Sequence, residues 1–336
     1  MSVIIKHKGK NNSKIHQILV NNKKLMTPTY FPSISGAEIR SEPLDLINVI
    51  IDEEYPRLLV SCYDVDKLTI ELKDTTIKKL NNYSTNGGFL MLDSGEFERY
   101  YLKFAEWTID KYQKMIRRIT ADFFFGFDKI PNMETKYDEM LKTATDNFSF
   151  SNSLVLNNHC ITILHGQNIE EICMLTEHMV KNYADLQFIA ITDKECGKTL
   201  QEQCMTVSLI RKICDDKEKD IIIHVLGCGN PLSIAALSYA GADIFDAVDW
   251  SRWVVDNKTW QCGNLSHIKL LDCSCIACCD EKAKNERIRA FQHNLIFYQD
   301  FIARLQNAIS QDYDVTSFLK NENIDQNVIE ILAKLF

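Results

Sequence analysis

Short apolar runs recur along most of this chain at intervals of roughly thirty residues. Each run ends in Gly, Asp, Ser or His and is followed by a segment whose apolar residues have helical spacing. This alternation is typical of repeated strand and helix units. The runs cover residues 27–33, 57–62, 88–92, 122–127, 160–164, 186–192, 221–226 and 243–248. Eight such units predict an α/β fold, the (β/α)8 TIM barrel.

The segments between and after these runs predict the helices and the domain organisation. Helices are expected at residues 105–119, 169–183, 199–214, 232–240, 286–309 and 327–336. The polar stretch 256–267 is predicted to be a loop that leads into a cysteine-bearing element. We therefore predict a barrel over residues 1–255 and, over residues 256–336, an appended element with C-terminal helices packed on the barrel.

Composition restricts the class of protein and its partners. With a net charge of −8, the overall field repels phosphate, so a nucleic-acid partner must be held by a local basic patch. Twelve cysteines in a chain with 46% hydrophobic residues indicate reduced thiols rather than a short disulfide scaffold. No run approaches the ~18 apolar residues of a membrane helix, and the apolar start is too short for a signal peptide. We expect a soluble, cytoplasmic protein with no membrane partner.

Polar residues stand at the C-terminal ends of the predicted strands, where barrel active sites lie. They are Asp93, Asp128, His165, Asp193, Gly227 and Asp246. Each alone is more often a cap or turn residue, but several carboxylates at one mouth fit a hard-metal site or glycosidic-bond chemistry. A purine edge offers N1–H and an amine as donors, which an aspartate accepts. Asp128 is therefore a candidate for reading guanine, and Asp246 for attacking the sugar.

A second constellation has the spacing of a metal site. Cys273, Cys275 and Cys278 stand within six residues, and His293 follows near a predicted helix start. Three thiolates and an imidazole suit a structural, tetrahedral zinc with no open position. Cys279 is a competing ligand, and unliganded thiols are the alternative. Zinc here would hold the appended element on the barrel and take no part in catalysis.

The order of these motifs resembles the tRNA-guanine transglycosylase superfamily from about residue 20 to residue 310. The resembling segments are 27–32 (TPTYFP), 92–97 (LDSGEF), 127–128 (FD), 224–229 (HVLGCG), 245–248 (FDAV) and the four metal-site residues. The resemblance implies exchange of a guanine in nucleic acid for a 7-deazaguanine base by double displacement. Zn2+ would be the structural cofactor.

The resemblance also implies roles, residue by residue. Asp246 would be the nucleophile that forms a covalent intermediate at C1′, and Asp93 the general acid and base. Asp128 would hold the guanine edge. The other substrate-binding residues implied are Ser94, Phe97, His165, Gly227 and Arg252. Phe97 would stack on the extruded base, with ordinary core packing as the alternative.

Several positions depart from the tRNA enzymes. Glu96 replaces a second Gly, and His165 replaces a Gln. The stretch 191–195 (ITDKE) replaces the Gly-Gly-Leu-Ala type segment, and Val255 stands where a second Arg would follow Arg252. These changes resemble the divergent branch that inserts 7-deazaguanine into DNA. DNA is therefore the favoured substrate, and a tRNA enzyme with altered tRNA recognition is the alternative.

Other readings stay open at this point. The basic segment 281–289 is expected either to contact a nucleic-acid backbone or to form a solvated helix face. Trp250 and Trp253 are expected either to stack on bases or to pack against the barrel rim. A non-catalytic partner subunit is a further alternative, which retention of Asp93, Asp128 and Asp246 disfavours. A small-molecule glycoside as substrate ranks lowest. A homodimer or accessory modification proteins are partners that the sequence does not decide.

Overall fold

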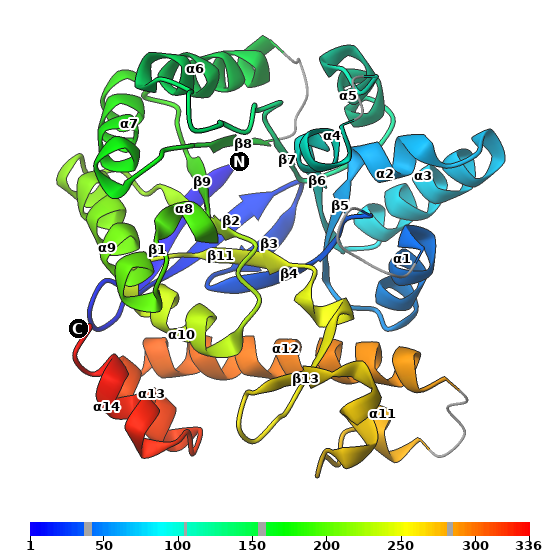
Figure 1. The fold of residues 1–336 in the computed structure, drawn as a ribbon, viewed down its shortest axis with the longest axis vertical. Coiled ribbons are helices and arrows are strands. Elements are labelled where there is room, and N and C mark those ends of the chain that lie inside the picture. The colour runs from blue at the N-terminus through cyan, green and yellow to red at the C-terminus, as the bar shows by residue number, and fades with distance from the viewer. Residues whose placement is uncertain (37–41, 104–105, 154–158, 281–284) are drawn as a thin grey trace.

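The barrel predicted from the eight apolar runs is confirmed in the computed structural model, which describes residues 1–36, 42–103, 106–153, 159–280 and 285–336 (Figure 1). Eight parallel strands close in the order β10-β11-β4-β5-β6-β7-β8-β9. They are β4 (Thr29–Ile34), β5 (Arg57–Ser61), β6 (Phe89–Asp93), β7 (Phe123–Phe125), β8 (His159–Ile163), β9 (Phe188–Thr192), β10 (Ile222–Leu226) and β11 (Ile244–Ala247). Each of these strands overlaps one of the eight predicted apolar runs.

Helices surround the strands (Figure 1). They are α1 (Pro43–Asp52), α2 (Cys62–Lys67), α3 (Ile70–Thr85), α4 (Glu96–Leu102), α5 (Ile109–Ile116), α6 (Tyr137–Ser153), α7 (Ile169–Asn182), α8 (Asp193–Cys196), α9 (Leu200–Asp216) and α10 (Pro231–Ala240). Side-chain caps fix several starts: Thr199 and Glu202 form a capping box on α9, and Asn230 caps α10. The helix predicted over 105–119 is shorter, because Thr108 caps α5, and Ala105 lies outside the described residues.

A three-stranded antiparallel sheet, which the sequence did not predict, packs against one end of the barrel interior. It contains β1 (Ser2–Lys8), β2 (Lys14–Val20) and β3 (Lys23–Met26). Ile18 and Leu25 belong to the same apolar cluster as the inward-facing strand residues. Lys23 Nζ lies 2.6 Å from Asp122, which precedes β7. The sheet therefore closes the N-terminal end of the barrel and leaves the C-terminal end open.

A buried ion network ties this sheet to the barrel wall. His16 Nδ1 lies 2.7 Å from Asp243 Oδ1, and Arg211 donates to Asp243 Oδ2 at 2.5 Å. All three side chains are buried. Burial alone would raise the pKa of Asp243, but His16 and Arg211 lower it. The network joins β2, α9 and the start of β11 at the closed end, away from the mouth.

After β11 the chain builds the appended element and the C-terminal helices. These are η1 (Asp249–Ser251), β12 (Trp253–Val255), β13 (Cys262–Asn264), η2 (Leu265–Leu270), α11 (Ile276–Cys279), α12 (Glu286–Ser310), α13 (Val315–Asn321) and α14 (Gln326–Leu332). The loop predicted over 256–267 is partly wrong, because β13 pairs with β12 through backbone hydrogen bonds that its sequence, Cys-Gly-Asn, does not signal. Within the described part of the chain, no helix is both long enough and apolar enough to cross a membrane.

Candidate active site

A cavity of about 510 Å3 opens at the C-terminal ends of the barrel strands. Every barrel strand, or the turn directly after it, contributes to its lining. The lining contains all eight residues that the sequence assigned to catalysis or substrate binding: Asp93, Ser94, Phe97, Asp128, His165, Gly227, Asp246 and Arg252. Asp193 lines it as well. The structure therefore brings the predicted residues together, although they span most of the chain.

Asp246 is held by the two strands that flank β11. Ser33 Oγ on β4 donates to Asp246 Oδ2 at 2.6 Å, and His224 Nε2 on β10 lies 2.8 Å from Asp246 Oδ1. The side chain is mostly buried but reaches the cavity. Neither Ser33 nor His224 was predicted as a site residue. Each is a polar residue inside a buried apolar strand, which is the signal that could have found them.

Asp93 is the last residue of β6 and holds a proton more tightly than an ordinary carboxyl group. Burial raises its pKa well above the usual value, and nearby Glu98 raises it further, while a hydrogen bond from the Gly95 N–H, at 2.9 Å, works against them. Gly95 has a φ of 78°, and a Cβ there would meet the Cβ of Tyr63 at 2.6 Å. This turn therefore requires glycine, and it delivers to the cavity a carboxyl group whose pKa is raised well above the usual value.

Asp128 and His165 form part of a hydrogen-bonded chain of four side chains. Ser94 Oγ donates to Asp128 Oδ1 at 3.0 Å, and His165 Nε2 lies 3.0 Å from Asp128 Oδ2. On its other side, His165 Nδ1 lies 2.9 Å from Glu195, a partner that the sequence did not predict. Burial opposes a charge on the ring, but the hydrogen bonds to the two carboxylates raise the pKa of His165 to about 10. The ring is an imidazolium at neutral pH.

Two further acidic residues stand near Asp93. Ser35 Oγ donates to Glu98 Oε1 at 2.6 Å, and the Gly36 N–H donates to Asp64 Oδ2 at 2.5 Å. Burial and the charge of Glu98 raise the pKa of Asp64 to about 8. The Asp64 carboxyl group, which lies behind the cavity lining, therefore holds a proton at neutral pH that an ordinary aspartate would release.

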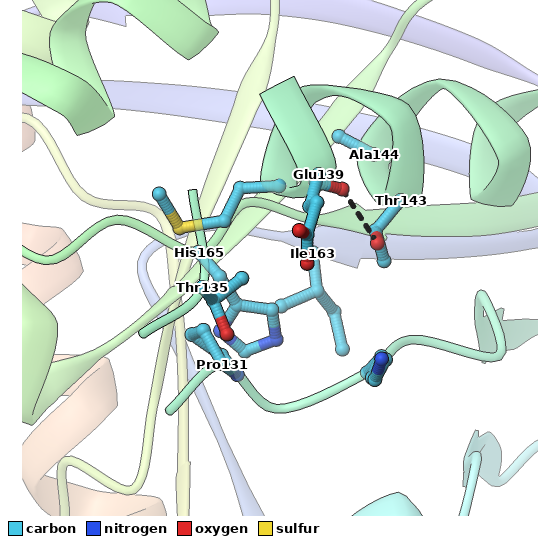
Figure 2. Close-up of a pocket in the computed structure, with 9 residues that line it drawn as sticks. Pro131, Thr135, Glu139, Thr143, Ala144, Ile163 and His165 are labelled. Carbon is cyan, nitrogen blue, oxygen red and sulfur yellow. Dashed lines mark hydrogen bonds between the residues drawn. The ribbon is translucent and has the colours of Figure 1, made fainter. Parts of the chain in front are cut away.

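A small side pocket of about 30 Å3 adjoins the main cavity at His165 (Figure 2). Figure 2 shows the His165 ring facing Thr135 and Glu139, with Thr143 Oγ1 donating to the Glu139 backbone oxygen at 2.9 Å. The pocket is too small for a nucleobase but large enough for about two water molecules. It therefore offers His165 a small neighbouring space lined by both polar and apolar side chains.

The structure shows the surroundings of Trp250, Trp253 and Phe97, for which base stacking and ordinary packing were the alternatives. Trp250 is fully buried and donates its indole N–H to the Ser33 oxygen at 2.9 Å, so it packs the rim. Trp253 is 41% exposed, with the Arg252 guanidinium 6.0 Å from its ring centroid. Phe97 lines the cavity and is only partly buried, so it is not ordinary core. Its ring centroid lies 4.4 Å from that of Tyr101, which is 54% exposed.

The positions that depart from the tRNA enzymes lie in several different places in the structure. Glu96 is buried, bonds Arg99 Nη2 at 2.5 Å and does not line the cavity. Val255 is also buried. Within the basic segment, residues 281–284 lie outside the described residues. Arg289 donates to the Asp280 oxygen at 2.7 Å.

The predicted metal ligands form one group. Cys273, Cys275, Cys278 and His293 offer ligand atoms that all lie within 4.8 Å of one another, and the exposed Cys279 is not in the group. His293 Nδ1 lies 3.6, 3.4 and 3.4 Å from the three sulfur atoms in that order. A tetrahedron with typical Zn–S and Zn–N bonds has an edge of roughly 3.6 Å, so the donor set fits zinc.

The histidine ligand is oriented by the protein. His293 Nε2 lies 2.8 Å from the Val255 oxygen, so its proton faces that carbonyl and Nδ1 is left bare for a metal. The residue lies in the third turn of α12, a helix that begins at Glu286 after the Asn285 cap, as the sequence predicted. The group therefore joins β12, α11 and α12.

Comparison with known proteins agrees with this geometry. A family model described as queuine tRNA-ribosyltransferase matches residues 10–321. The tRNA-guanine(15) transglycosylase of Methanococcus vannielii is 29% identical over 87% of this chain and 48% of its own length. The enzyme of the same name from Pyrococcus furiosus is 23% identical over 89% of this chain and 52% of its own. This chain thus spans about half the length of these relatives, and it belongs to the queuine tRNA-ribosyltransferase family.

Proposed function

We propose that this protein exchanges a guanine base in a polynucleotide for another base through a covalent intermediate on Asp246. The observation that carries the proposal is that three aspartates line one cavity but differ in their pKa and in their hydrogen-bond partners. Asp93 has a raised pKa, Asp246 receives two hydrogen bonds, and Asp128 pairs with a charged imidazole. Carboxyl groups whose environments differ in this way suit separate roles as acid, nucleophile and binding group.

The reaction divides into two displacements. In the first, an Asp246 oxygen bonds to C1′ while the C1′–N9 bond breaks, and the departing guanine takes up the electron pair and the proton of Asp93. In the second, the incoming base returns a proton to Asp93 and attacks C1′ through N9. The C1′–O bond then breaks, and Asp246 recovers its carboxylate.

The remaining cavity residues suit recognition of a guanine-like edge. Both oxygens of Asp128 already accept hydrogen bonds, from Ser94 and His165, which fixes the carboxylate in place. Its other lone pairs are available to N1–H and the exocyclic amine. A 7-deazaguanine presents the same edge, so one set of contacts serves both bases. Phe97 supplies a stacking surface at the cavity wall.

We propose DNA as the polynucleotide. Two departures from the tRNA enzymes support this choice. His165, an imidazolium, stands in place of a neutral Gln, and the buried Val255 stands where a second arginine would follow Arg252. A tRNA substrate is the second candidate, favoured by the relatives, which are named tRNA-guanine(15) transglycosylases.

We further propose that the Cys3His group binds structural zinc. The spacing of the four ligand atoms and the orientation of His293 support this choice. Four protein ligands leave no open position, so the ion would supply folding energy and no chemistry.

The test is incorporation of labelled guanine by the purified protein into duplex DNA and, separately, into bulk tRNA, with Asp246→Ala as control. We expect label in DNA that depends on Asp246. Label in tRNA alone would give the second candidate. Label in neither, together with retained function of Asp246→Asn in a complex, would make the protein a non-catalytic subunit.

A further inference from the structure

His224 lies beside the Asp246 carboxylate and has no role in the function proposed above. Its Nε2 is 2.8 Å from Asp246 Oδ1, while Ser33 holds the other oxygen. The ring is fully buried, with its centroid 5.5 Å from that of Phe125. Each oxygen of the proposed nucleophile therefore has one neighbouring donor from the protein.

The surroundings fix where the ring proton lies. An ionised carboxylate only accepts hydrogen bonds, so Nε2 carries the proton. Nδ1 is buried and has no hydrogen-bond partner among the described residues. A proton on Nδ1 would be a buried donor without an acceptor, which costs more than a bare lone pair. The ring is therefore neutral and protonated on Nε2 alone.

We propose that His224 is a positioning residue that stabilises Asp246 when it leaves C1′ in the second displacement; this inference rests on the proposed function. In the first displacement Asp246 loses its charge as the ester forms. In the second, the C1′–O bond breaks and the electron pair returns to the carboxylate oxygen. A fixed neutral donor stabilises that returning charge and transfers no proton. Loss of the donor should thus slow the second displacement more than the first.

The test compares His224→Phe, which keeps a ring but loses the donor, with His224→Gln, which keeps a donor. A guanine-containing oligonucleotide is used, the covalent adduct is measured on denaturing gels, and exchange is measured with labelled guanine. In His224→Phe we expect exchange to fall about 10²-fold while the share of protein trapped as adduct rises. His224→Gln should recover most of the exchange. Equal losses of adduct and exchange in His224→Phe would overturn the proposal.

His16→Phe is the matched control for loss of a buried pair. His16 is also fully buried and pairs with an aspartate, Asp243, but at the closed end of the barrel. We expect it to lower Tm without changing the share of adduct. A rise in adduct like that of His224→Phe would show that the effect follows from destabilisation and would overturn the proposal.

A second measurement separates this inference from the proposed function. The 15N shifts of the His224 ring in the wild-type protein report which nitrogen is protonated, whether or not the protein is active. An Nε2-protonated neutral ring supports the inference, and an Nδ1-protonated or charged ring overturns it. A wild-type protein that forms no adduct contradicts the proposed function, while the ring measurement still decides the protonation of His224.

Discussion

The protonation of the His165 side chain makes the stability of the fold depend on pH. Its pKa of about 10 exceeds the ordinary value of about 6.5, because hydrogen bonds to Asp128 and Glu195 outweigh the cost of burial. The folded protein therefore holds a proton that the unfolded chain releases. This contribution to stability is complete below about pH 6.5 and is lost as the pH rises through about 10.

We predict that His165→Gln removes this dependence. At pH 6 the variant should have an unfolding free energy lower than that of the wild type by on the order of 2–4 kcal/mol, and the difference should shrink by pH 10. Urea denaturation at both pH values measures it, with the exposed His267→Gln as control. An equal difference at both pH values would contradict the charged state of His165.

Asp64 gives a pH dependence of the same sign, but in a lower pH range. Its carboxyl group has a pKa of about 8, raised by burial and Glu98, against an ordinary value of about 4. The folded state keeps a proton that the unfolded chain loses, so this group lowers stability as the pH rises from about 4 to 8.

We predict that Asp64→Asn flattens the profile in that range. The variant should match the wild type near pH 5 and exceed its Tm at pH 8, because the amide keeps an acceptor for the Gly36 N–H without a charge. Thermal denaturation followed by circular dichroism at both pH values measures the effect. A variant whose Tm differs from the wild type equally at both would disprove the raised pKa.

Sequence reasoning found the residues at the strand ends but not those behind them. Asp93, Asp128 and Asp246 were visible because barrel topology places strand ends at one mouth. Ser33, His224 and Glu195 act through contacts between residues far apart in the chain. Ser33 and His224 gave only the local signal of a polar residue in a buried apolar strand, which does not identify their partner. Ser33 and Asp246, for example, lie 213 residues apart in sequence.

At the scale of elements, strong apolar runs made the strands of the barrel predictable, whereas the strands of the two antiparallel sheets were missed. The hairpin of β2 and β3 turns at Asn21 and Asn22, whose φ values are 48° and 62°. An Asn pair favours such a turn, so this signal was present, although the flanking strands mix buried and exposed residues. The hairpin of β12 and β13 gave no such signal.

The metal-binding element is predicted to depend on its ion. Cys275→Ser should bind less than one zinc per chain and lower Tm by roughly 5 °C or more, because the group joins β12, α11 and α12. The matched control is Cys279→Ser, an exposed neighbour outside the group. Plasma emission spectroscopy and thermal denaturation measure both effects. Equal behaviour of the two variants would exclude Cys275 as a ligand.

At the scale of the whole molecule, charge opposes a polyanionic substrate. The chain has a net charge of −8, and seven carboxyl groups line the cavity against His165, Lys194 and Arg252. Exposed aromatic rings stand nearby: Tyr101, which lines the cavity, is 54% exposed, and Trp253, beside the cavity residue Arg252, is 41% exposed. Stacking on unpaired bases, rather than attraction to phosphate, is therefore expected to supply most of the affinity at the described rim.

Because stacking is expected to outweigh phosphate contacts, the binding affinity should depend only weakly on salt concentration. The affinity for a single-stranded oligonucleotide should fall with a log–log slope of about −1.4, because we expect Lys194 and Arg252 each to contact one phosphate and each contact on a single strand contributes about −0.7. Tyr101→Ala should weaken binding by about 1–3 kcal/mol, and Tyr101→Phe should keep it. Fluorescence anisotropy between 50 and 200 mM salt tests both predictions. A slope much steeper than this would show that phosphate contacts dominate.

Closure of the barrel between β4 and β11 has a consequence for synthesis on the ribosome. The Ser33 that holds Asp246 is made 213 residues before it. At 5–20 residues per second, β4 waits roughly 10–40 s for its partner strand to appear. During that time one edge of β4 has no partner strand, and an unpaired strand edge is prone to pair with other chains and aggregate. Fusing a stalling sequence before residue 244 should therefore yield an aggregation-prone chain that has no active site.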